Sequence, residues 1–371
     1  MNDELSNSIY DYLRQFENID FSIYTSRQVL CAIEKDTLAT SDLFALLSPS
    51  ALHHLELMAR RAKEITLRNF GRVISLYAPL YLSNYCVNQC AYCGYRDTND
   101  ITRTTLSIDD VRREAEAIAG TGIRNILILT GESRGASSVS YIQECVLILK
   151  AYFPYIAVEI YPLEQGEYET LFRVGVDGLT IYQETYDELR YLELHPSGPK
   201  RNFRYRLDTP DRAARARCRT ITIGALMGLS EWRTDAAMTA LHARYLENTY
   251  PYIELGVSMP RIRPEAGGYR APYAVDDESF VQMMLAFRLF LPHAGITIST
   301  RERSSFRDKL IGIGATRMSA GSKTSVGGYA DSIHDTGQFD VADTRSVTEF
   351  CAAITAKGYQ PVMHDWQNLG G

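Results

Sequence analysis

The sequence contains no long apolar run, its first residues do not resemble a signal peptide, and positive charge is not in excess. A membrane-spanning helix needs roughly 18 or more consecutive apolar residues, and no such stretch occurs. The N-terminus, MNDELSNSIYDYLRQ, is acidic and polar rather than basic and then apolar. With 39 basic and 45 acidic side chains the formal net charge is −6, and no basic tract is present. We therefore expect a cytoplasmic protein that contacts neither a membrane nor nucleic acid.

The sequence also contains no internal repeats and no low-complexity linkers, and its cysteines do not form an even number that could all pair in disulfides. The seven cysteines are an odd number, and the reducing cytoplasm disfavours disulfides. A chain of 371 residues, 45% hydrophobic and 23% charged, buries enough surface to fold without such crosslinks. Cys31, Cys145, Cys218 and Cys351 stand alone, which is typical of small buried hydrophobic side chains. The other three cysteines lie within one stretch of eight residues.

Eight short apolar runs, separated by amphipathic segments, dominate the chain after residue 70. The runs cover residues 73–81, 124–130, 157–162, 178–183, 221–227, 253–259, 295–300 and 315–320. Helices are expected from Ser107 onward and at about 140–150, 166–174, 209–217, 234–247, 276–291 and 343–356. This alternation predicts an α/β fold, a closed (β/α)8 barrel of the TIM type. An open doubly wound sheet is the alternative.

Three parts are expected along the chain. Residues 1–70 form an N-terminal helical extension, in which Ser48 and Pro49 precede an apolar stripe at helical spacing that ends at Gly71. Residues 71–330 form the barrel, and residues 331–371 form a C-terminal helical segment that packs on it.

Polar residues gather where the predicted strands end. They are the loop 86–93; Thr130, Gly131 and Glu132; Glu159 and Tyr161; Tyr182, Gln183 and Glu184; Ser258, Arg261 and Arg263; Ser299, Arg301 and Glu302; and Ser319, Ser322 and Lys323. Because active sites of such barrels lie at the carboxyl ends of the strands, the sequence predicts a site there.

The cysteine-rich loop indicates a metal centre. Cys86, Cys90 and Cys93 have the spacing C-x3-C-x2-C. A structural zinc site would need a fourth protein ligand, and no second cysteine pair or pair of histidines at zinc-ligand spacing accompanies the loop. An iron–sulfur cube also needs four ligands, so three cysteines leave one iron open to another molecule.

This spacing, with the aromatic Tyr92 just before the last cysteine, resembles the cluster loop of the radical S-adenosylmethionine (SAM) enzymes. The resemblance implies a [4Fe–4S] cluster held by Cys86, Cys90 and Cys93, with SAM chelating the open iron. It further implies that Gly131 and Glu132 meet the amino group of SAM. Glu159 would lie near the ribose, and Arg212 would pair with the carboxylate of SAM.

Further segments narrow the resemblance to the tyrosine lyases of thiamine biosynthesis. They are residues 78–84 (APLYLSN), 182–186 (YQETY), 208–212 (DTPDR), 260–264 (PRIRP), 298–302 (ISTRE) and 327–329 (GGY). The implied reaction uses the 5′-deoxyadenosyl radical to cleave the Cα–Cβ bond of L-tyrosine, giving 2-iminoacetate and p-cresol. The implied partners are a thiazole synthase, which consumes the 2-iminoacetate, and a reduced flavodoxin or ferredoxin.

An amino-acid substrate carries a carboxylate, which a guanidinium grips best. Arg301 is the expected clamp, with Ser299 and Ser319 as hydroxyl donors and Arg261 or Arg263 as alternatives. Three other functions stay open: a tryptophan lyase, a non-catalytic metal-binding scaffold, and the tyrosine lyase of hydrogenase maturation. The last carries a second cysteine-ligated cluster, for which this sequence shows no ligands.

Overall fold

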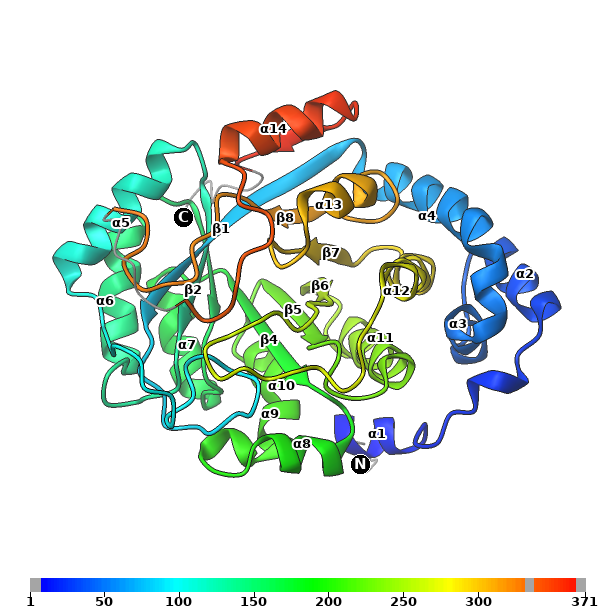
Figure 1. Ribbon diagram of the computed structural model, residues 1–371, viewed down its shortest axis with the longest axis horizontal. Helices are drawn as coiled ribbons and strands as arrows, with labels where there is room; N and C mark the ends of the chain where they lie inside the picture. The colour runs from blue at the N-terminus through cyan, green and yellow to red at the C-terminus, as the bar shows by residue number, and fades with distance from the viewer. Residues whose placement is uncertain (1–7, 331–336, 365–371) are drawn as a thin grey trace, which may run out of the picture.

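The computed structural model describes residues 8–330 and 337–364. Its centre is a closed barrel of parallel strands in which each strand pairs with the next along the chain, and β1 pairs with β2 and β8 to close the ring (Figure 1). The strands are β1 (Val73–Ser83), β2 (Asn125–Thr130), β3 (Tyr155–Glu159), β4 (Gly178–Glu184), β5 (Thr220–Ala225), β6 (Glu254–Ser258), β7 (Gly295–Ile298) and β8 (Arg317–Ser319). The predicted (β/α)8 barrel is confirmed, and the open sheet is excluded by the β1–β2 pairing.

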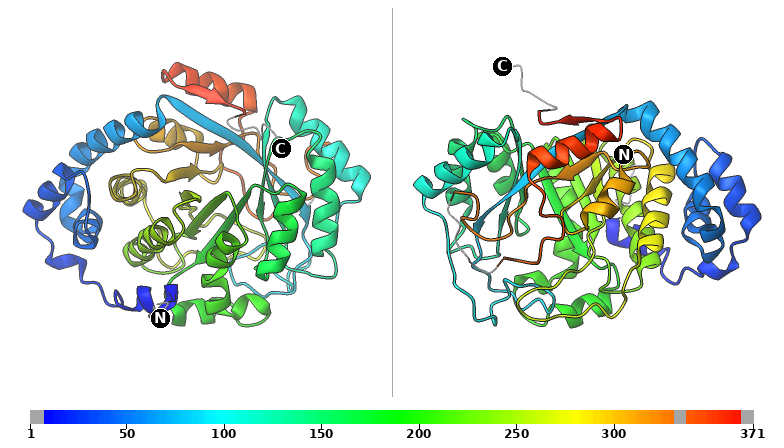
Figure 2. Two further views of the ribbon diagram at one scale, coloured as in Figure 1. Left: turned by 180° about the vertical axis from the view of Figure 1, so that it is seen from behind. Right: turned by 45° about the horizontal axis from the view of Figure 1, so that its top comes forward.

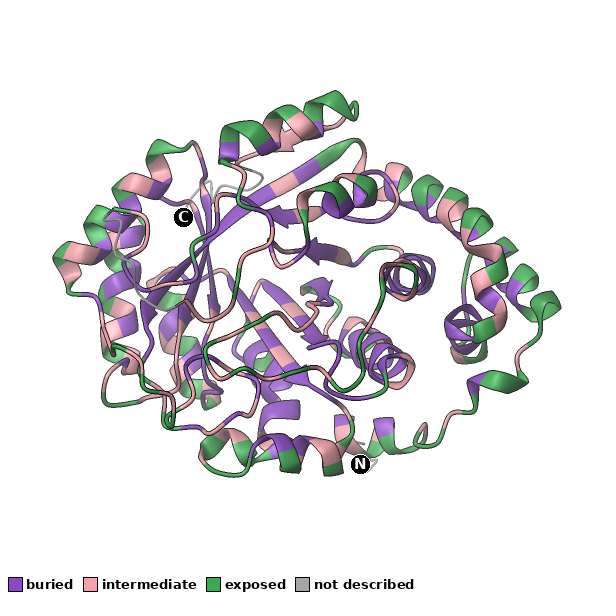
Figure 3. Ribbon diagram, in the orientation of Figure 1, coloured by how far each residue is buried: buried purple, intermediate pink, exposed green. Residues whose placement is uncertain are grey.

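Helices cover the outside of the barrel. They are α5 (Ile108–Gly120), α6 (Val139–Leu149), α7 (Gln165–Val174), α8 (Glu188–Leu194), α9 (Phe203–Leu207), α10 (Thr209–Arg215), α11 (Trp232–Thr249), α12 (Asp277–Phe290) and α13 (Ser304–Leu310). Helix α5 begins as predicted, because Ser107 and Asp110 form a capping box, and it buries Val111, Ala115 and Ile118. The strands and the inner helix faces are buried, and the outer helix faces are exposed (Figure 3).

The N-terminal residues wrap one side of the barrel as helices α1 (Ile9–Arg14), α2 (Ser26–Glu34), α3 (Thr40–Leu47) and α4 (Leu55–Phe70) (Figures 1 and 2). Helix α4 packs on α12, and α1 packs on α11. The helix expected after Pro49 starts as a 3-10 turn, Pro49–His54, and ends as predicted at Gly71, which has φ of 70°. Among the described residues, every helix is too short or too polar to cross a membrane.

The C-terminal part contains one strand besides the expected helix. Helix α14 (Val347–Ala356) is followed by β9 (Gln360–Val362), which pairs in parallel with Val73–Ser75 of β1 (Figure 2). A three-residue strand has no periodicity that sequence analysis would detect. The expected boundary at residue 331 lies outside the described residues.

Two irregularities shape the mouth of the barrel. A bulge between Tyr81 and Ser83 places Ser83 opposite Thr130, the last residue of β2. A second bulge precedes Glu184, whose φ of 73° is rare for a residue with a side chain. Bulges redirect side chains, and both of these lie at strand ends that line the site.

Candidate active site

A cavity lies at the carboxyl ends of the strands, where sequence analysis predicts a site. Residues from all the predicted strand ends line it, and so do the segments that follow β1, β6 and β8. In Figure 1 the segments that follow β6 and β8 cross in front of the strands, and the segment that follows β1 lies at the lower left. Ten predicted site residues line the same cavity: Cys86, Cys90, Tyr92, Cys93, Gly131, Glu132, Glu159, Ser299, Arg301 and Ser319.

The cysteine loop forms one side of this cavity and is held by backbone hydrogen bonds to two other loops. The N–H of Val87 donates to the carbonyl of Glu132 at 2.9 Å, and the N–H of Ala91 donates to the carbonyl of Leu194 at 3.0 Å. These contacts come from the ends of β2 and α8, so the barrel itself positions the loop.

The three thiols fit an iron–sulfur cluster better than a single ion. Among the described residues, no group of three or more His, Cys, Asp or Glu side chains converges on one point where a single metal ion would bind. In a cluster each thiolate binds a different iron, so the sulfurs stay further apart. Burial, with smaller contributions from Cys93 and Cys86, raises the pKa of Cys90 to about 12, so a metal centre that binds this thiolate would displace its proton.

A hydrogen bond between Tyr92 and His195 anchors the cysteine loop. The Tyr92 hydroxyl donates to Nε2 of His195 at 2.7 Å, because Nδ1 of His195 lies 2.7 Å from the carbonyl of Tyr191 and carries the proton. Burial lowers the pKa of His195 to about 3, which keeps the imidazole neutral and leaves Nε2 free to accept. His195 therefore positions Tyr92 and takes no part in a metal site.

Gly131 brings the end of β2 against the cysteine loop. A Cβ atom at this position would lie 2.2 Å from the carbonyl oxygen of Tyr85, so only glycine fits. The next residue, Glu132, accepts a 2.6 Å hydrogen bond from Nδ2 of Asn88, and the same amide lies 3.8 Å from Sγ of Cys86. The Gly-Glu pair is thus directly connected to the cysteine loop.

A buried ion cluster lies beside the cysteines. Nζ of Lys200 and a guanidinium nitrogen of Arg206 lie 2.8 and 3.3 Å from Oε1 of Glu184. Burial alone would raise the pKa of Glu184, but the two cations outweigh it and hold that pKa below its usual value. Two cations against one carboxylate leave net positive charge at the cavity wall, which suits an anionic group of a ligand.

Glu159 and Arg301 are two further titratable side chains that line the cavity. Burial raises the pKa of Glu159 to about 7, with Arg301 opposing the rise. The guanidinium of Arg301 lies 3.3 Å from the ring centroid of Phe339. Among the described residues neither side chain has a salt-bridge partner within 4 Å, so Arg301 is available to a carboxylate from outside the protein.

Arg212, predicted to meet SAM, lies outside this cavity. Its guanidinium donates to the carbonyls of Leu163 and Tyr205 at 2.9 and 2.7 Å and stacks on the Tyr205 ring. Arg206, six residues earlier, lines the cavity instead. The DTPDR motif lies next to an arginine that faces the cavity, but sequence spacing does not reveal which arginine faces inward.

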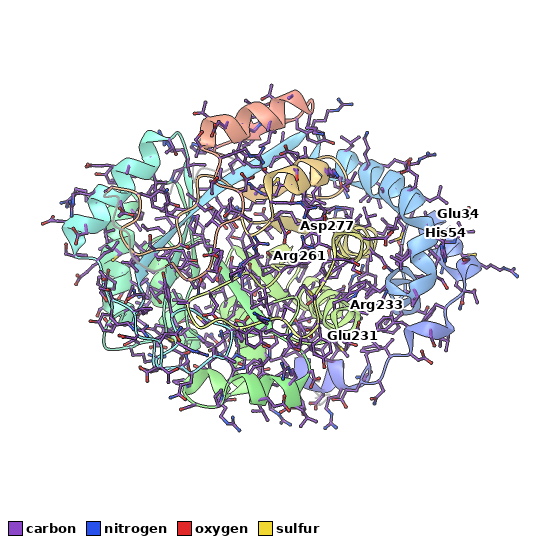
Figure 4. The ribbon with its side chains drawn as sticks, viewed as in Figure 1. Glu34, His54, Glu231, Arg233, Arg261 and Asp277 are labelled. Atoms are coloured by element: carbon purple, nitrogen blue, oxygen red, sulfur yellow. The ribbon has the colours of Figure 1, made fainter. Side chains whose placement is uncertain are left out.

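Arg261 and Arg263, the alternative candidates for binding the substrate carboxylate, differ in their surroundings. Arg261 pairs with Asp277 at 3.0 Å (Figure 4) and with Glu302, whose Oε1 lies 2.9 Å from its Nε. Because of these two pairs, the charge of Arg261 is already neutralised within the protein. Arg263, in contrast, lines the cavity.

Sequence analysis missed Lys200, Arg206, Gln338 and Phe339, all of which line the cavity. Lys200 and Arg206 belong to short elements after β4, and Gln338 and Phe339 follow β8 by about twenty residues. None lies directly at a strand end, the only positional signal that the sequence offers.

Comparisons with known proteins agree with this geometry. The model of the Radical SAM superfamily matches residues 80–240, and that of the Biotin and Thiamin Synthesis associated domain matches residues 258–360. The 2-iminoacetate synthase of Escherichia coli (strain K12) is 41% identical over 348 residues, which cover 94% of this chain and 92% of that protein. The 2-iminoacetate synthase of Salmonella typhimurium (strain LT2) is 40% identical over the same shares.

A solved structure with the same fold is the FeFe-hydrogenase maturase HydG from Carboxydothermus hydrogenoformans. It superposes with a TM-score of 0.85 at 31% identity, covering 92% of this chain and 80% of that chain. Methylornithine synthase, at 21% identity and a TM-score of 0.72, shares the fold. From the identity over nearly its whole length, the cysteine loop and the barrel, the chain belongs to the 2-iminoacetate synthase family of radical SAM enzymes.

Proposed function

We propose that this protein cleaves the Cα–Cβ bond of L-tyrosine, giving 2-iminoacetate and p-cresol, with SAM converted to methionine and 5′-deoxyadenosine. The observation that carries the proposal is one cavity that combines two kinds of binding group. Three cysteines that fit a cluster line it, and so does the Arg301 guanidinium, which has no carboxylate partner among the described residues. Tyr77, Tyr81 and Tyr182 stand in the same cavity and offer aromatic walls for a phenol ring.

The chain's own residues bind and orient. Cys86, Cys90 and Cys93 would hold a [4Fe–4S] cluster, which with SAM supplies the 5′-deoxyadenosyl radical. Gly131 and Glu132 receive the amino group of SAM, Glu159 accepts from its ribose hydroxyls, and Arg206 takes the carboxylate role first given to Arg212. Arg301 binds the substrate carboxylate, with Ser299 and Ser319 beside it.

Holding both reactants in one cavity contributes proximity and limits the access of water to the radical. The loops after β1, β6 and β8 contribute residues to the wall of this cavity. The reaction needs a one-electron reductant, for which we propose a flavodoxin or ferredoxin. We further propose that a thiazole synthase consumes the 2-iminoacetate.

The hydrogenase maturase HydG shares the fold, but the cysteines here favour the simpler lyase. Cys31 and Cys351 lie on α2 and α14, while Cys145 and Cys218 are buried on α6 and before β5. In the described part of the chain these four cysteines lie on separate elements, so they form no ligand set for a second cluster.

The test is anaerobic turnover with product analysis. Protein reconstituted with about four irons per chain is supplied with SAM, dithionite and either tyrosine or tryptophan, and p-cresol and 5′-deoxyadenosine are quantified. We expect both products with tyrosine, and their loss in Cys86→Ala but not in Cys351→Ala, which removes a cysteine on α14.

Three results would contradict the proposal in different ways. Formation of 5′-deoxyadenosine without p-cresol removes tyrosine as the substrate, and products from tryptophan alone favour the tryptophan lyase. Absence of both an iron–sulfur cluster and SAM cleavage in the wild type favours the non-catalytic scaffold.

A further inference from the structure

Residues 337–339 pass between the cysteine loop and the barrel mouth. The backbone N–H of Gln338 donates to the carbonyl of Thr324 at 3.0 Å, and Oγ1 of Thr324 donates to the carbonyl of Phe339 at 2.9 Å. On the other side the segment touches Gly94, where an added Cβ would lie 2.6 Å from the carbonyl oxygen of Gln338. This close approach places the Gln338 side chain next to the last cysteine of the loop.

The Gln338 amide bridges the barrel and Cys93. The hydroxyl of Tyr81, on β1, donates to Oε1 at 2.9 Å, and Nε2 lies 3.9 Å from Sγ of Cys93, within the range of a hydrogen bond to sulfur. A metal-bound thiolate only accepts hydrogen bonds, so it orients the N–H groups of the amide toward itself. The oxygen is then left to the Tyr81 hydroxyl, and the two contacts support each other.

We propose that Gln338 is a positioning residue that donates a hydrogen bond to the Cys93 thiolate and thereby raises the reduction potential of the cluster, with Tyr81 fixing the orientation of the amide. The inference rests on the proposed cluster at Cys86, Cys90 and Cys93. Reduction adds negative charge that spreads onto the sulfur ligands. A donor to sulfur stabilises the reduced state more than the oxidised state, so the potential rises.

A hydrogen bond from Gln338 to the Cys93 thiolate would affect the first step of the reaction. Radical generation begins with reduction of the cluster, and a higher potential makes that electron easier to supply. The adjacent Phe339 supports Arg301 on its ring, so the same three-residue segment serves both the cluster side and the substrate side of the cavity.

The experiment is a redox titration of the loaded protein followed by electron paramagnetic resonance. Gln338→Met keeps the size of the side chain and removes the N–H donor. Gln338→Glu keeps an acceptor for Tyr81 and replaces the donor by a negative charge. At a fixed solution potential we expect at least a threefold lower ratio of reduced to oxidised cluster in the Met variant, equivalent to about 30 mV for a one-electron couple. The Glu variant is expected to shift further in the same direction.

Gln360→Met is the matched control, since Gln360 is exposed on β9, and its potential should equal that of the wild type. An unshifted potential in a Gln338→Met protein with full iron content overturns the inference. If that variant binds less iron, Tyr81→Phe decides the question: it leaves Gln338 in place but frees the amide, so a lower potential supports the inference and an unchanged one overturns it.

The inference and the proposed function fail separately. A wild-type protein that assembles no cluster removes the proposed function and with it the inference. A wild-type protein that yields p-cresol, while the Gln338 variants keep its potential, removes the inference alone.

Discussion

The ligands that the cavity can bind depend on which of its charged side chains already have a partner in the protein. Glu302 and Asp277 neutralise Arg261, and Arg206 shares Glu184 with Lys200. Arg301 instead lies against an aromatic ring, which supports a planar cation without neutralising it. Arg301 is therefore available to a carboxylate that enters the cavity.

Arg301→Lys should raise the KM for tyrosine about 10- to 100-fold. Hydrogen bonds to charged groups contribute about 1.5–3 kcal/mol, and lysine does not form the two parallel bonds of a guanidinium. Steady-state kinetics with p-cresol detection measures the change, and SAM affinity is expected to stay the same. Arg303→Lys, at an exposed arginine paired with Asp277, is the control. An unchanged KM in Arg301→Lys would assign the substrate carboxylate to another residue.

At the scale of elements, the cluster loop depends on the meeting of two strand ends. The bulge in β1 aligns Ser83 with the last residue of β2, and the N–H of Gly131 then donates to the carbonyl of Ser83 at 2.9 Å. The strand pairing within the barrel thus extends into the loop that carries the cysteines. Any atom added at this junction must displace backbone.

Gly131→Ala tests this junction. The new Cβ would overlap the carbonyl oxygen of Tyr85, so the cysteine loop has to move, and the iron bound per chain should fall to less than about half of the wild-type value because metal affinity depends on ligand placement. Iron and sulfide analysis with SAM-binding measurements gives the readout. Gly135→Ala, four residues later and with open space around it, should behave as the wild type. Full iron content and normal SAM binding in Gly131→Ala would show that the loop tolerates the shift.

At the scale of the whole molecule, the C-terminal segment is tied to the barrel by buried charge. Asp343 is fully buried with Arg307 of α13, and Arg345 adds a second cation at 2.7 Å. The backbone N–H groups of Ala342 and Asp343 donate to the carbonyl of Thr300, at 2.9 and 3.2 Å. This tether lies between Gln338 and α14, so it holds the segment that covers the cavity.

Asp343→Ala should lower the free energy of unfolding by about 3–5 kcal/mol, because removing one partner leaves a buried guanidinium unpaired. Urea denaturation followed by circular dichroism measures this loss. Glu56→Ala breaks the exposed pair with Arg60 and should cost less than about 1 kcal/mol. Equal losses in the two variants would refute the tethering role of the buried pair.

The strands and the cysteine loop were predictable from the sequence, whereas several of the other site residues were not. Each of the eight apolar runs became a strand, with ends shifted by a few residues, because a strand buried on both faces needs an unbroken apolar run. The cysteine loop and the strand-end residues Glu132, Glu159 and Arg301 reached one cavity because parallel strands in a barrel end on the same side. Short elements such as α9 and β9 carried too little periodicity to be found.

The barrel, the spacing of three thiols and the family were predictable from the sequence alone, because apolar periodicity and ligand spacing are local properties of the chain. Tertiary structure alone decided that Arg206 rather than Arg212 faces the cavity and that Arg301 is left without a carboxylate partner. It alone brought Gln338 to Cys93 across 245 residues of chain. The physical reason is that partnership and burial of a polar side chain depend on what the rest of the fold packs around it.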